Sequence, residues 1–245
     1  MLITYTATVI KKEEIAPHIY LIQLNYPENE HWSFQAGQYM IFHLPSKENG
    51  HPARRLYSIA SSPLQKNGLD FIIEIVPGGL GSTFIEKIHE GEKFTVQGPA
   101  GIFTRQESPR DMVLLATGTG IAPMYSMIQE MLLAGNDNPQ PNIHLFWGLK
   151  HKADIYLKKE LDTLADAYSH FQYSICLSRE KDSPNTRCLL GRVTLGLQRL
   201  IESKKDSESQ FDYYLCGSPH VVEALKEDLL KKQVPKNQIF FEKFS

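Results

Sequence analysis

The sequence has few cysteines and no excess of basic charge. Its 245 residues include three cysteines, Cys176, Cys188 and Cys216, which are too few and too widely spaced for a four-cysteine iron–sulfur or zinc site. The formal net charge of −2 lacks the basic excess that is typical of nucleic-acid-binding proteins. We therefore expect no metal site and no nucleic-acid partner, and we expect any iron–sulfur partner to be a separate protein.

Long apolar runs are also missing. No stretch approaches the roughly 20 apolar residues that a membrane-spanning helix requires. Residues 1–9 lack the basic segment of a signal peptide and have the pattern of a strand instead. We therefore expect no membrane span and a cytoplasmic protein, while the sequence leaves the oligomeric state open.

Short strand-like segments fill the first part of the chain, residues 1–107. Glycine and proline turn signals separate them, and one helix is predicted over Ser82–Ile88, ended by Gly91. Six strands with one helix are typical of a small antiparallel barrel. The predicted strands are Tyr5–Lys12, Ile19–Asn25, Gln38–His43, Ala53–Ala60, Leu69–Val76 and Lys93–Gln97.

In residues 108–245 strands and helices alternate. This order predicts a parallel sheet with helices on both faces and ligands beyond the carboxyl ends of its strands. The predicted fold class is therefore a two-domain protein, an antiparallel six-stranded barrel followed by a parallel-sheet α/β domain. The predicted strands are Val113–Ala116, Ile143–Trp147, Phe171–Leu177, Tyr213–Cys216 and Ile239–Phe241, and the predicted helices are Met124–Ala134, Tyr156–Tyr168, Leu195–Ile201 and Val221–Lys232.

An arginine, a tyrosine and a serine with the spacing R-x-Y-S lie in the fourth predicted strand, as Arg55, Tyr57 and Ser58. Alternation along a strand places Arg55 and Tyr57 on one face and Ser58 on the other. A guanidinium group offers a planar cationic fork to a pyrophosphate, and a tyrosine ring can lie on an isoalloxazine. The pattern suits a flavin dinucleotide, although by itself it is also compatible with an ordinary half-buried strand.

A second motif joins a buried strand to a helix. Residues 112–116 form a continuous apolar run, as expected of a strand that is buried on both faces. Gly118 and Gly120 allow a tight turn, and Pro123 suits the first turn of the following helix. The N-terminus of that helix would offer free N–H groups to a second pyrophosphate. A plain strand–turn–helix is the alternative, but together the two motifs suggest electron transfer from a nicotinamide to a flavin.

These motifs, in this order, resemble those of the ferredoxin–NADP(+) reductase superfamily, and the resemblance covers essentially the whole chain. It implies an FAD-binding barrel in residues 1–107 and an NAD(P)-binding domain in residues 108–245. By this resemblance Arg55 pairs with the FAD pyrophosphate, Tyr57 packs on the isoalloxazine and Ser58 lies near flavin N5. No iron–sulfur domain is expected within the chain.

Other segments carry the same resemblance. Gly79-Leu80-Gly81-Ser82 matches a second flavin motif at a helix start, and Gly98–Phe103 matches the joint that closes the barrel. Residues 116–123 resemble the pyrophosphate loop of the nicotinamide dinucleotide. Tyr214–Pro219 resembles a motif whose cysteine lies beside the nicotinamide, and the ending Phe240–Ser245 resembles one that lies near the flavin edge.

The resemblance thus implies a set of site residues. The predicted catalytic residues are Ser58, Cys216 and Glu242. The predicted cofactor-binding residues are Arg55, Leu56, Tyr57, Ser58, Ile59, Val76, Gly79, Gly81, Ser82, Thr83, Thr117, Gly118, Thr119, Gly120, Pro123, Ser178, Arg179, Arg192, Cys216, Gly217 and Phe244.

Positive charge at the predicted sheet edge favours NADPH over NADH. The 2′-phosphate of NADPH is an anion that needs cations or hydroxyl groups. The third strand of the second domain ends in Ser178-Arg179, a pair that resembles the one in NADP-binding members. Lys150–Lys152 and Arg192 add positive charge, and Glu180 is the closest acidic residue. The predicted cofactors are therefore FAD and NADPH, with NADH possible.

The expected activity is that of an NAD(P)H-dependent FAD oxidoreductase. Hydride would pass from NADPH to FAD at the joint between the domains, and electrons would then pass to a separate acceptor such as ferredoxin or flavodoxin. The alternatives are a free-flavin or ferric reductase and the reductase component of an oxygenase. An alternative of another class is a non-catalytic electron-transfer or regulatory subunit of a larger complex, but such members usually carry a late cysteine cluster that this sequence lacks.

Overall fold

The chain folds into two units. The structure, a computed structural model, describes residues 2–27, 32–45, 52–135, 140–183, 185–204 and 210–244. Unit 1 comprises Met1–Arg105 and Tyr125–Leu133, and unit 2 comprises Gln106–Met124 and Ala134–Ser245. The division after Arg105 lies close to the predicted boundary at residue 107, whereas the place of Tyr125–Leu133 in unit 1 was not predicted.

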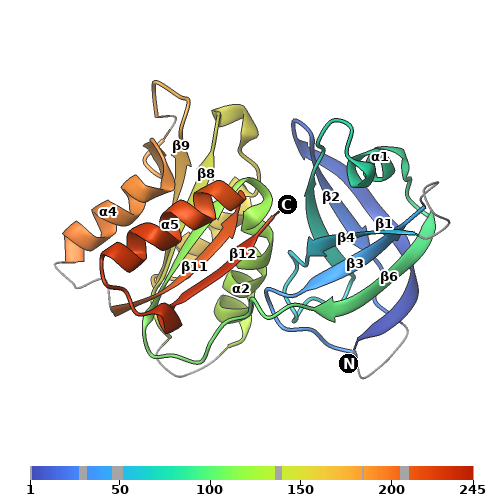
Figure 1. The fold of residues 1–245 in the computed structure, drawn as a ribbon, viewed down its shortest axis with the longest axis horizontal. Coiled ribbons are helices and arrows are strands. Elements are labelled where there is room, and N and C mark those ends of the chain that lie inside the picture. The colour runs from blue at the N-terminus through green and yellow to red at the C-terminus, as the bar shows by residue number, and fades with distance from the viewer. Residues whose placement is uncertain are drawn as a thin grey trace. The chain divides into compact units, whose positions relative to one another are not determined.

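Within its described residues, unit 1 contains six antiparallel strands, each on one of the predicted strands (Figure 1). The strands are β1 (Ile3–Ala16), β2 (Ile19–Leu24), β3 (Tyr39–Leu44), β4 (Ala53–Ser58), β5 (Leu69–Glu74) and β6 (Lys93–Ala100). They follow the order β4-β3-β6-β1-β2-β5. Ile59, just after β4, forms a bridge with Phe71 of β5 and so joins the two edges. The predicted antiparallel barrel is confirmed.

The core of unit 1 holds the flavin-motif strand in place. Phe42 of β3 is fully buried, and its ring lies 4.9–5.0 Å from the rings of Phe71 and Phe94. The same ring meets Tyr57 of β4 edge-on at 4.7 Å. Full burial of a large apolar side chain stabilises a fold by about 1.5–3 kcal/mol, so this cluster fixes β4 on the barrel. A helix, α1 (Leu80–Lys87), lies between β5 and β6.

The described part of unit 2 contains six parallel strands in the order β10-β9-β8-β7-β11-β12. The strands are β7 (Asp111–Thr117), β8 (Ile143–Leu149), β9 (Phe171–Leu177), β10 (Cys188–Leu190), β11 (Phe211–Gly217) and β12 (Ile239–Lys243). The helices of unit 2 are α3 (Lys158–Ala167), α4 (Val193–Lys204) and α5 (Pro219–Lys231), and α2 (Ile121–Leu133) begins in unit 2 but belongs to unit 1 from Tyr125 onward. The predicted strands and helices are confirmed; the short β10 was not predicted because three residues carry too little pattern.

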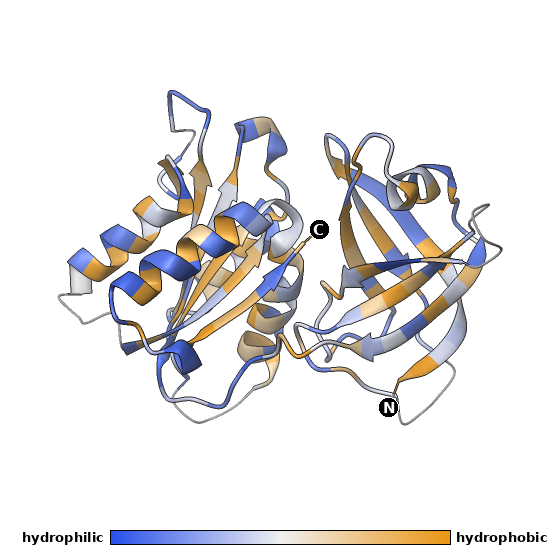
Figure 2. Cartoon of the chain, viewed as in Figure 1, coloured by the Kyte–Doolittle hydropathy of each residue, from blue (hydrophilic) through white to orange (hydrophobic). Residues whose placement is uncertain are grey.

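Helices α4 and α5 cover the same face of this sheet (Figure 1). Their buried residues pack with apolar residues of β7, β8 and β11, and Figure 2 shows apolar and polar residues alternating along both helices. No helix within the described ranges has the length and the apolar character that a membrane-spanning segment needs.

The strand order of unit 2 reverses at β7. This strand pairs with β8 on one side and with β11 on the other. In open parallel sheets, ligands bind beyond the carboxyl ends of the strands at such a reversal. Thr117 ends β7 and Gly217 ends β11, so both predicted nicotinamide motifs lie at this point.

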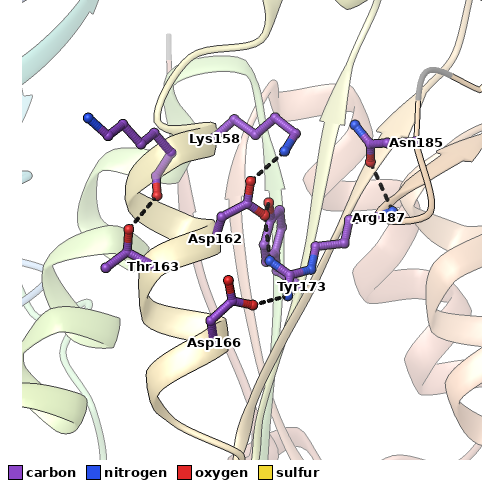
Figure 3. Close-up of polar contacts among 8 residues, drawn as sticks. Lys158, Asp162, Thr163, Asp166, Tyr173, Asn185 and Arg187 are labelled. Atoms are coloured by element: carbon purple, nitrogen blue, oxygen red, sulfur yellow. Dashed lines mark hydrogen bonds and ion pairs between the residues drawn. The ribbon is translucent and has the colours of Figure 1, made fainter.

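A charged cluster ties α3 to the segment before β10 (Figure 3). The carboxylate of Asp162 accepts hydrogen bonds from Tyr173 Oη at 2.6 Å, from Lys158 and from Arg187. Arg187 also donates to Asp166 at 2.6 Å. Burial alone would raise the pKa of Asp162, but the three donors outweigh it and lower this pKa to about 2. Asp162 is therefore ionised at any physiological pH.

Candidate functional site

Strand β4 presents the predicted flavin motif on the surface of unit 1. Arg55 is exposed, Tyr57 is half-buried and Ser58 is buried, with 7% of its surface accessible. Burial raises the pKa of Tyr57 to about 12, although the charge of Arg55 opposes this shift. The Tyr57 hydroxyl is therefore neutral at physiological pH and can donate a hydrogen bond.

Gly81 brings the two predicted flavin motifs together. A Cβ atom at this position would overlap the Tyr57 hydroxyl oxygen and would lie 3.3 Å from Arg55 Cγ. Arg55 and Tyr57 thus meet the start of α1 on the same face of β4, as alternation predicts. A glycine is required here because any side chain would displace one of the two groups that are predicted to bind FAD.

The start of α1 has the features of an anion site. Its N-cap, Gly79, offers no side-chain partner, and the first turn contains no acidic residue. The first N–H groups of a helix have no partner within the helix, and they favour a negative ligand. Ser82 Oγ accepts a hydrogen bond from Val76 N–H at 2.7 Å, and the N–H of half-buried Thr83 donates to Gly79 O at 2.9 Å. These contacts fix the turn that precedes the helix.

Exposed apolar side chains accompany this anion site. Leu56 and Val76 are each 56% exposed and Leu80 is 37% exposed. Apolar side chains beside a few polar groups are typical of cofactor sites. Ile59, in contrast, is fully buried in the barrel core, and its N–H donates to Gln38 O at 2.9 Å. Its side chain is therefore unable to reach a cofactor. Of the groups of Ile59, only the backbone carbonyl is left for the predicted cofactor contact.

In unit 2 the predicted pyrophosphate loop is a single turn of 3₁₀-helix, Gly118–Gly120, between β7 and α2. Gly118 has φ +53°, in the left-handed region that glycine adopts readily. A Cβ atom at Gly120 would lie 2.7 Å from the backbone nitrogen of Gly217 and even closer to the Cys216 carbonyl. The loop after β7 and the end of β11 therefore touch, which is possible only with a glycine at position 120.

Thr117 and Gly217 make the second contact between these motifs. Thr117 Oγ1 accepts a hydrogen bond from Ser218 N–H at 3.1 Å. Gly217 has φ +128°, and a Cβ atom there would lie 2.6 Å from the Thr117 carbonyl oxygen. Its own carbonyl accepts from Phe244 N–H at 2.9 Å. Thr117, Gly217 and Phe244, all predicted cofactor residues, thus meet at the strand ends, while Pro123 lies within the first turn of α2.

Cys216 and Glu242 are partners on neighbouring strands. They face each other in the register of β11 and β12. Cys216 is 1% exposed, and burial followed by the charge of Glu242 holds the pKa of its thiol well above the usual value. The thiol is therefore neutral and is unsuited to act as a nucleophile.

The predicted 2′-phosphate residues also lie together. Gly191 N–H donates to Leu177 O at 2.9 Å, which brings exposed Arg192 to the end of β9, where exposed Ser178 and Arg179 follow. Ser178 Oγ donates to Leu149 O at 3.2 Å.

Glu180, next to this group, is engaged by the loop that follows β8. It accepts a hydrogen bond from Lys152 N–H at 2.9 Å and lies 3.5 Å from His151 Nδ1. The Lys152 backbone bond, opposed by burial and supported by His151, lowers the pKa of Glu180. The acidic group closest to the predicted phosphate site therefore has partners of its own.

Two aromatic residues of this site were not predicted. Trp147 Nε1 and Tyr156 Oη donate hydrogen bonds to the Gly118 carbonyl at 2.9 and 3.2 Å. The sequence places Trp147 in an apolar strand, where an aromatic residue looks like an ordinary core residue. One feature of the sequence could have indicated them: the polar atom of a buried tryptophan or tyrosine needs a hydrogen-bond partner.

The described residues contain no group of three or more His, Cys, Asp and Glu side chains that could hold a metal ion. The two loops instead offer N–H groups, glycines and cations, a set that fits pyrophosphates. The residues present therefore fit two dinucleotides, one on each unit.

Comparison with known protein families assigns both units. Residues 6–104 match the oxidoreductase FAD-binding domain, and residues 114–227 match the oxidoreductase NAD-binding domain. The first match contains β4 and α1, and the second contains the Gly118–Gly120 loop and Cys216. Each family domain thus contains motifs that were assigned to its cofactor, whereas the ending Phe240–Ser245 lies outside both matches.

Similar proteins are oxygenase components. The chain is 29% identical over 243 residues to the toluate 1,2-dioxygenase electron transfer component of Pseudomonas putida, covering 98% of this chain and 68% of that protein. It is 28% identical over 244 residues to the propane 2-monooxygenase reductase component of Gordonia sp., covering 98% and 67%. For the anthranilate 1,2-dioxygenase electron transfer component of Acinetobacter baylyi the identity is 29%, covering 86% and 58%. The chain thus spans about three-fifths to two-thirds of these curated relatives.

Solved structures show the same arrangement of elements. The cytochrome P450 reductase GcoB of Amycolatopsis superposes with a TM-score of 0.84 at 27% identity, over 99% of this chain and 70% of that one. The ferredoxin-NADP+ reductase of Plasmodium falciparum gives 0.78 at 21% identity, over 98% and 96%, which shows the fold alone. With its FAD-binding barrel followed by an NAD-binding parallel sheet, the chain belongs to the ferredoxin–NADP(+) reductase superfamily of flavoprotein oxidoreductases.

Proposed function

We propose that this protein is an NADPH-preferring FAD reductase that acts as the electron-transfer component of an oxygenase system. It would take hydride from NADPH and pass electrons to a separate iron–sulfur protein in the cytoplasm. Relatives that match nearly all of this chain are electron-transfer or reductase components of oxygenases, which supports this assignment. Three free, buried cysteines leave the 245 residues without the ligands of an iron–sulfur centre, so the iron–sulfur acceptor would lie outside these residues.

The FAD site would be formed by β4 and the start of α1. Arg55 and the first N–H groups of α1 would neutralise the pyrophosphate, since both converge at Gly81. Tyr57 would supply a neutral ring and hydroxyl, and Leu56 and Val76 would cover the flavin with apolar surface. Bound FAD would supply the conversion between two-electron and one-electron chemistry.

Ser58 and Cys216 would act near the reacting atoms. Ser58, at the end of β4, would donate a hydrogen bond to flavin N5 and hold the ring in position. Cys216 would border the nicotinamide with a neutral, polarisable thiol, which adds no charge where hydride leaves. Glu242, paired with Cys216 in the strand register, would add the one acidic group of this set.

The preference for NADPH would come from the cations at the end of β9. Ser178, Arg179 and Arg192 are exposed at that end and would bind the 2′-phosphate. Glu180 would compete little with the 2′-phosphate for these cations, because the Glu180 carboxylate already binds Lys152 N–H and His151. The Arg179→Ala variant should therefore raise the KM for NADPH about tenfold and leave the KM for NADH almost unchanged.

An anaerobic titration tests the proposed activity. The visible spectrum of the purified protein, supplied with FAD if needed, should show flavin bands that bleach faster with NADPH than with NADH. Addition of a [2Fe–2S] ferredoxin should then accelerate reduction of cytochrome c in proportion to the ferredoxin concentration. Faster bleaching with NADH would reverse the cofactor preference, and a protein that binds no flavin would refute the assignment as a flavin reductase.

A free-flavin reductase would behave differently in the same experiment. The glycine-rich turn and the helix start at Gly79–Ser82 favour a tightly held dinucleotide over a flavin that enters and leaves as a substrate. FAD that remains bound through gel filtration supports the proposal. Activity that saturates with added free FMN or riboflavin would favour the alternative.

A further inference from the structure

The carbonyl of Gly118 has three hydrogen-bond donors. Trp147 Nε1 donates at 2.9 Å and Tyr156 Oη at 3.2 Å, and the Ile121 N–H closes the 3₁₀ turn onto the same oxygen. The two aromatic residues come from different segments, the end of β8 and the stretch before α3. They also contact each other, with their rings 4.7 Å apart in an edge-on arrangement. Gly118 O is thus anchored from the side of the protein that faces away from solvent.

Burial gives this anchor a direction. Trp147 is fully buried and Tyr156 is 5% exposed, so the Gly118 carbonyl points into the interior of unit 2. A trans peptide is planar, and its C=O and N–H groups point in opposite directions. The N–H in the same peptide belongs to Thr119, a half-buried residue of the loop. Anchoring the carbonyl inward therefore aims the Thr119 N–H outward.

We propose that Trp147 and Tyr156 are positioning residues for the pyrophosphate of the nicotinamide dinucleotide. By anchoring the Gly118 carbonyl, they keep the Thr119 N–H directed at the position of the ligand phosphates. The proposal rests on the NAD(P) site described above, and it adds two residues that never touch the ligand. The Ile121 N–H already donates to carbonyls within the turn. The Thr119 N–H belongs to the peptide whose carbonyl Trp147 and Tyr156 hold, so these two residues set its orientation.

The left-handed backbone of Gly118 makes such an anchor useful. With φ +53° and no side chain, this residue has more backbone freedom than any other residue type would have. Without side-chain donors on its carbonyl, the peptide between Gly118 and Thr119 could rotate at little cost. Two donors on one acceptor, both on rigid aromatic rings, restrict that rotation in advance and lower the entropic cost of binding.

Conservative variants separate the donors from the packing. Tyr156→Phe and Trp147→Phe each remove a donor and keep an aromatic ring. Binding would be measured by calorimetry with NADP⁺, which contains the pyrophosphate, and with adenosine 2′-phosphate, which has no 5′-phosphate. Circular dichroism of each variant reports whether the protein, including unit 2, is folded. Tyr173→Phe is the matched control, because it removes a buried hydroxyl of the same unit at the Asp162 cluster.

Each single variant should bind NADP⁺ about threefold to tenfold more weakly while its affinity for adenosine 2′-phosphate is unchanged. The double variant should lose more than the product of the two single effects, because in each single variant the remaining donor still anchors the carbonyl. Tyr173→Phe should leave both affinities unchanged. If Trp147→Phe fails to fold, Tyr156→Phe, which deletes a single oxygen atom, decides the question by itself.

Two results would overturn the proposal. The first is unchanged NADP⁺ affinity in Tyr156→Phe and, where it folds, in the double variant. The second is an equal loss for NADP⁺ and adenosine 2′-phosphate, which would indicate general damage to unit 2. A wild-type protein that binds neither NADP⁺ nor NAD⁺ would instead contradict the proposed function itself. If NAD⁺ binds more tightly, NAD⁺ and adenosine replace the two ligands and the comparison is the same.

Discussion

At the scale of single residues, the site is defined by what lies against its glycines. Gly81 lies under Tyr57 and Arg55, and Gly120 lies against the peptide between Cys216 and Gly217. In each case a methyl group would occupy space that belongs to a predicted ligand-binding group. The two glycines therefore lie at the positions where separate motifs of the sequence come into contact.

Replacing Gly81 with alanine should weaken FAD binding at least tenfold, because the new Cβ would displace the Tyr57 hydroxyl or the Arg55 side chain. The affinity is measured by fluorescence titration of the apoprotein with FAD. The double variant Gly81→Ala with Tyr57→Phe removes the oxygen that the methyl group meets, so it should recover part of the loss. If the double variant binds no better than Gly81→Ala alone, the contact with Tyr57 is not the cause.

The Ser58→Ala variant should retain FAD but should be reduced by NADPH about tenfold more slowly, because one hydrogen bond to the flavin is lost. Stopped-flow measurement of flavin bleaching gives this rate. Ser62→Ala is a suitable control, since Ser62 is also buried and its hydroxyl accepts from Leu64 N–H at 3.1 Å. A rate in Ser58→Ala equal to that of the wild type would remove Ser58 from the mechanism.

At the scale of elements, the charged cluster around Asp162 holds α3 to the segment before β10. The folded-state pKa of Asp162, about 2, lies below its ordinary value of 3.8. Its contribution to stability is therefore complete above about pH 4 and is lost as the pH falls from there to about 2. Acid should loosen this edge of the sheet before the remaining strands.

The Asp162→Asn variant should lower the free energy of unfolding by about 1–2 kcal/mol at pH 7, a value reduced from the full linkage because the side chain is 30% exposed. Urea unfolding at pH 7 and at pH 3 provides the comparison, and the difference between wild type and variant should shrink at the lower pH. Asp166→Asn is the control: its side chain is 70% exposed and within the cluster of Figure 3 it bonds only to Arg187, so the substitution should cost less stability. A constant difference at both pH values would contradict the assigned pKa.

The elements themselves could be predicted, because they depend on local pattern. Alternation gave the barrel strands, and a continuous apolar run gave the buried β7. The contacts that orient the site could not be predicted, because they join distant parts of the chain. Trp147 and Tyr156 look like core residues in the sequence, and their shared partner, Gly118, appears only when β8 lies beside β7. The short β10 was missed because three residues carry too little pattern, whereas the contact of Gly81 with Tyr57 was missed because it joins distant parts of the chain.

At the scale of the whole molecule, α2 divides between the two units. Its residues Tyr125–Leu133 belong to unit 1, where Ser126 Oγ donates to Ser61 O at 2.6 Å and Gln129 Nε2 donates to Ala60 O at 3.0 Å. Ser126 is fully buried. The stretch that follows Ser58 is thus held by a helix that begins after the Gly118–Gly120 loop.

A fragment of residues 1–107 should therefore be less stable than the same barrel with α2 attached. Without α2 the carbonyls of Ala60 and Ser61 lose their donors, and we expect its thermal midpoint to lie well below that of the same fragment joined by a glycine–serine linker to residues 121–133. Circular dichroism against temperature, with and without FAD, compares the two. Equal midpoints would show that Tyr125–Leu133 contribute nothing to the barrel.

The divided helix also limits how this fold can be recombined. A single crossover near residue 107 would join a barrel from one parent to a nicotinamide domain from another, and it would bring along the wrong parent's residues 125–133. The carbonyls of Ala60 and Ser61 would then face a helix from the other parent, which need not carry the donors Ser126 and Gln129. The exchangeable module is therefore discontinuous in the gene, so a chimera designed to change cofactor preference should keep Tyr125–Leu133 from the parent that supplies the barrel.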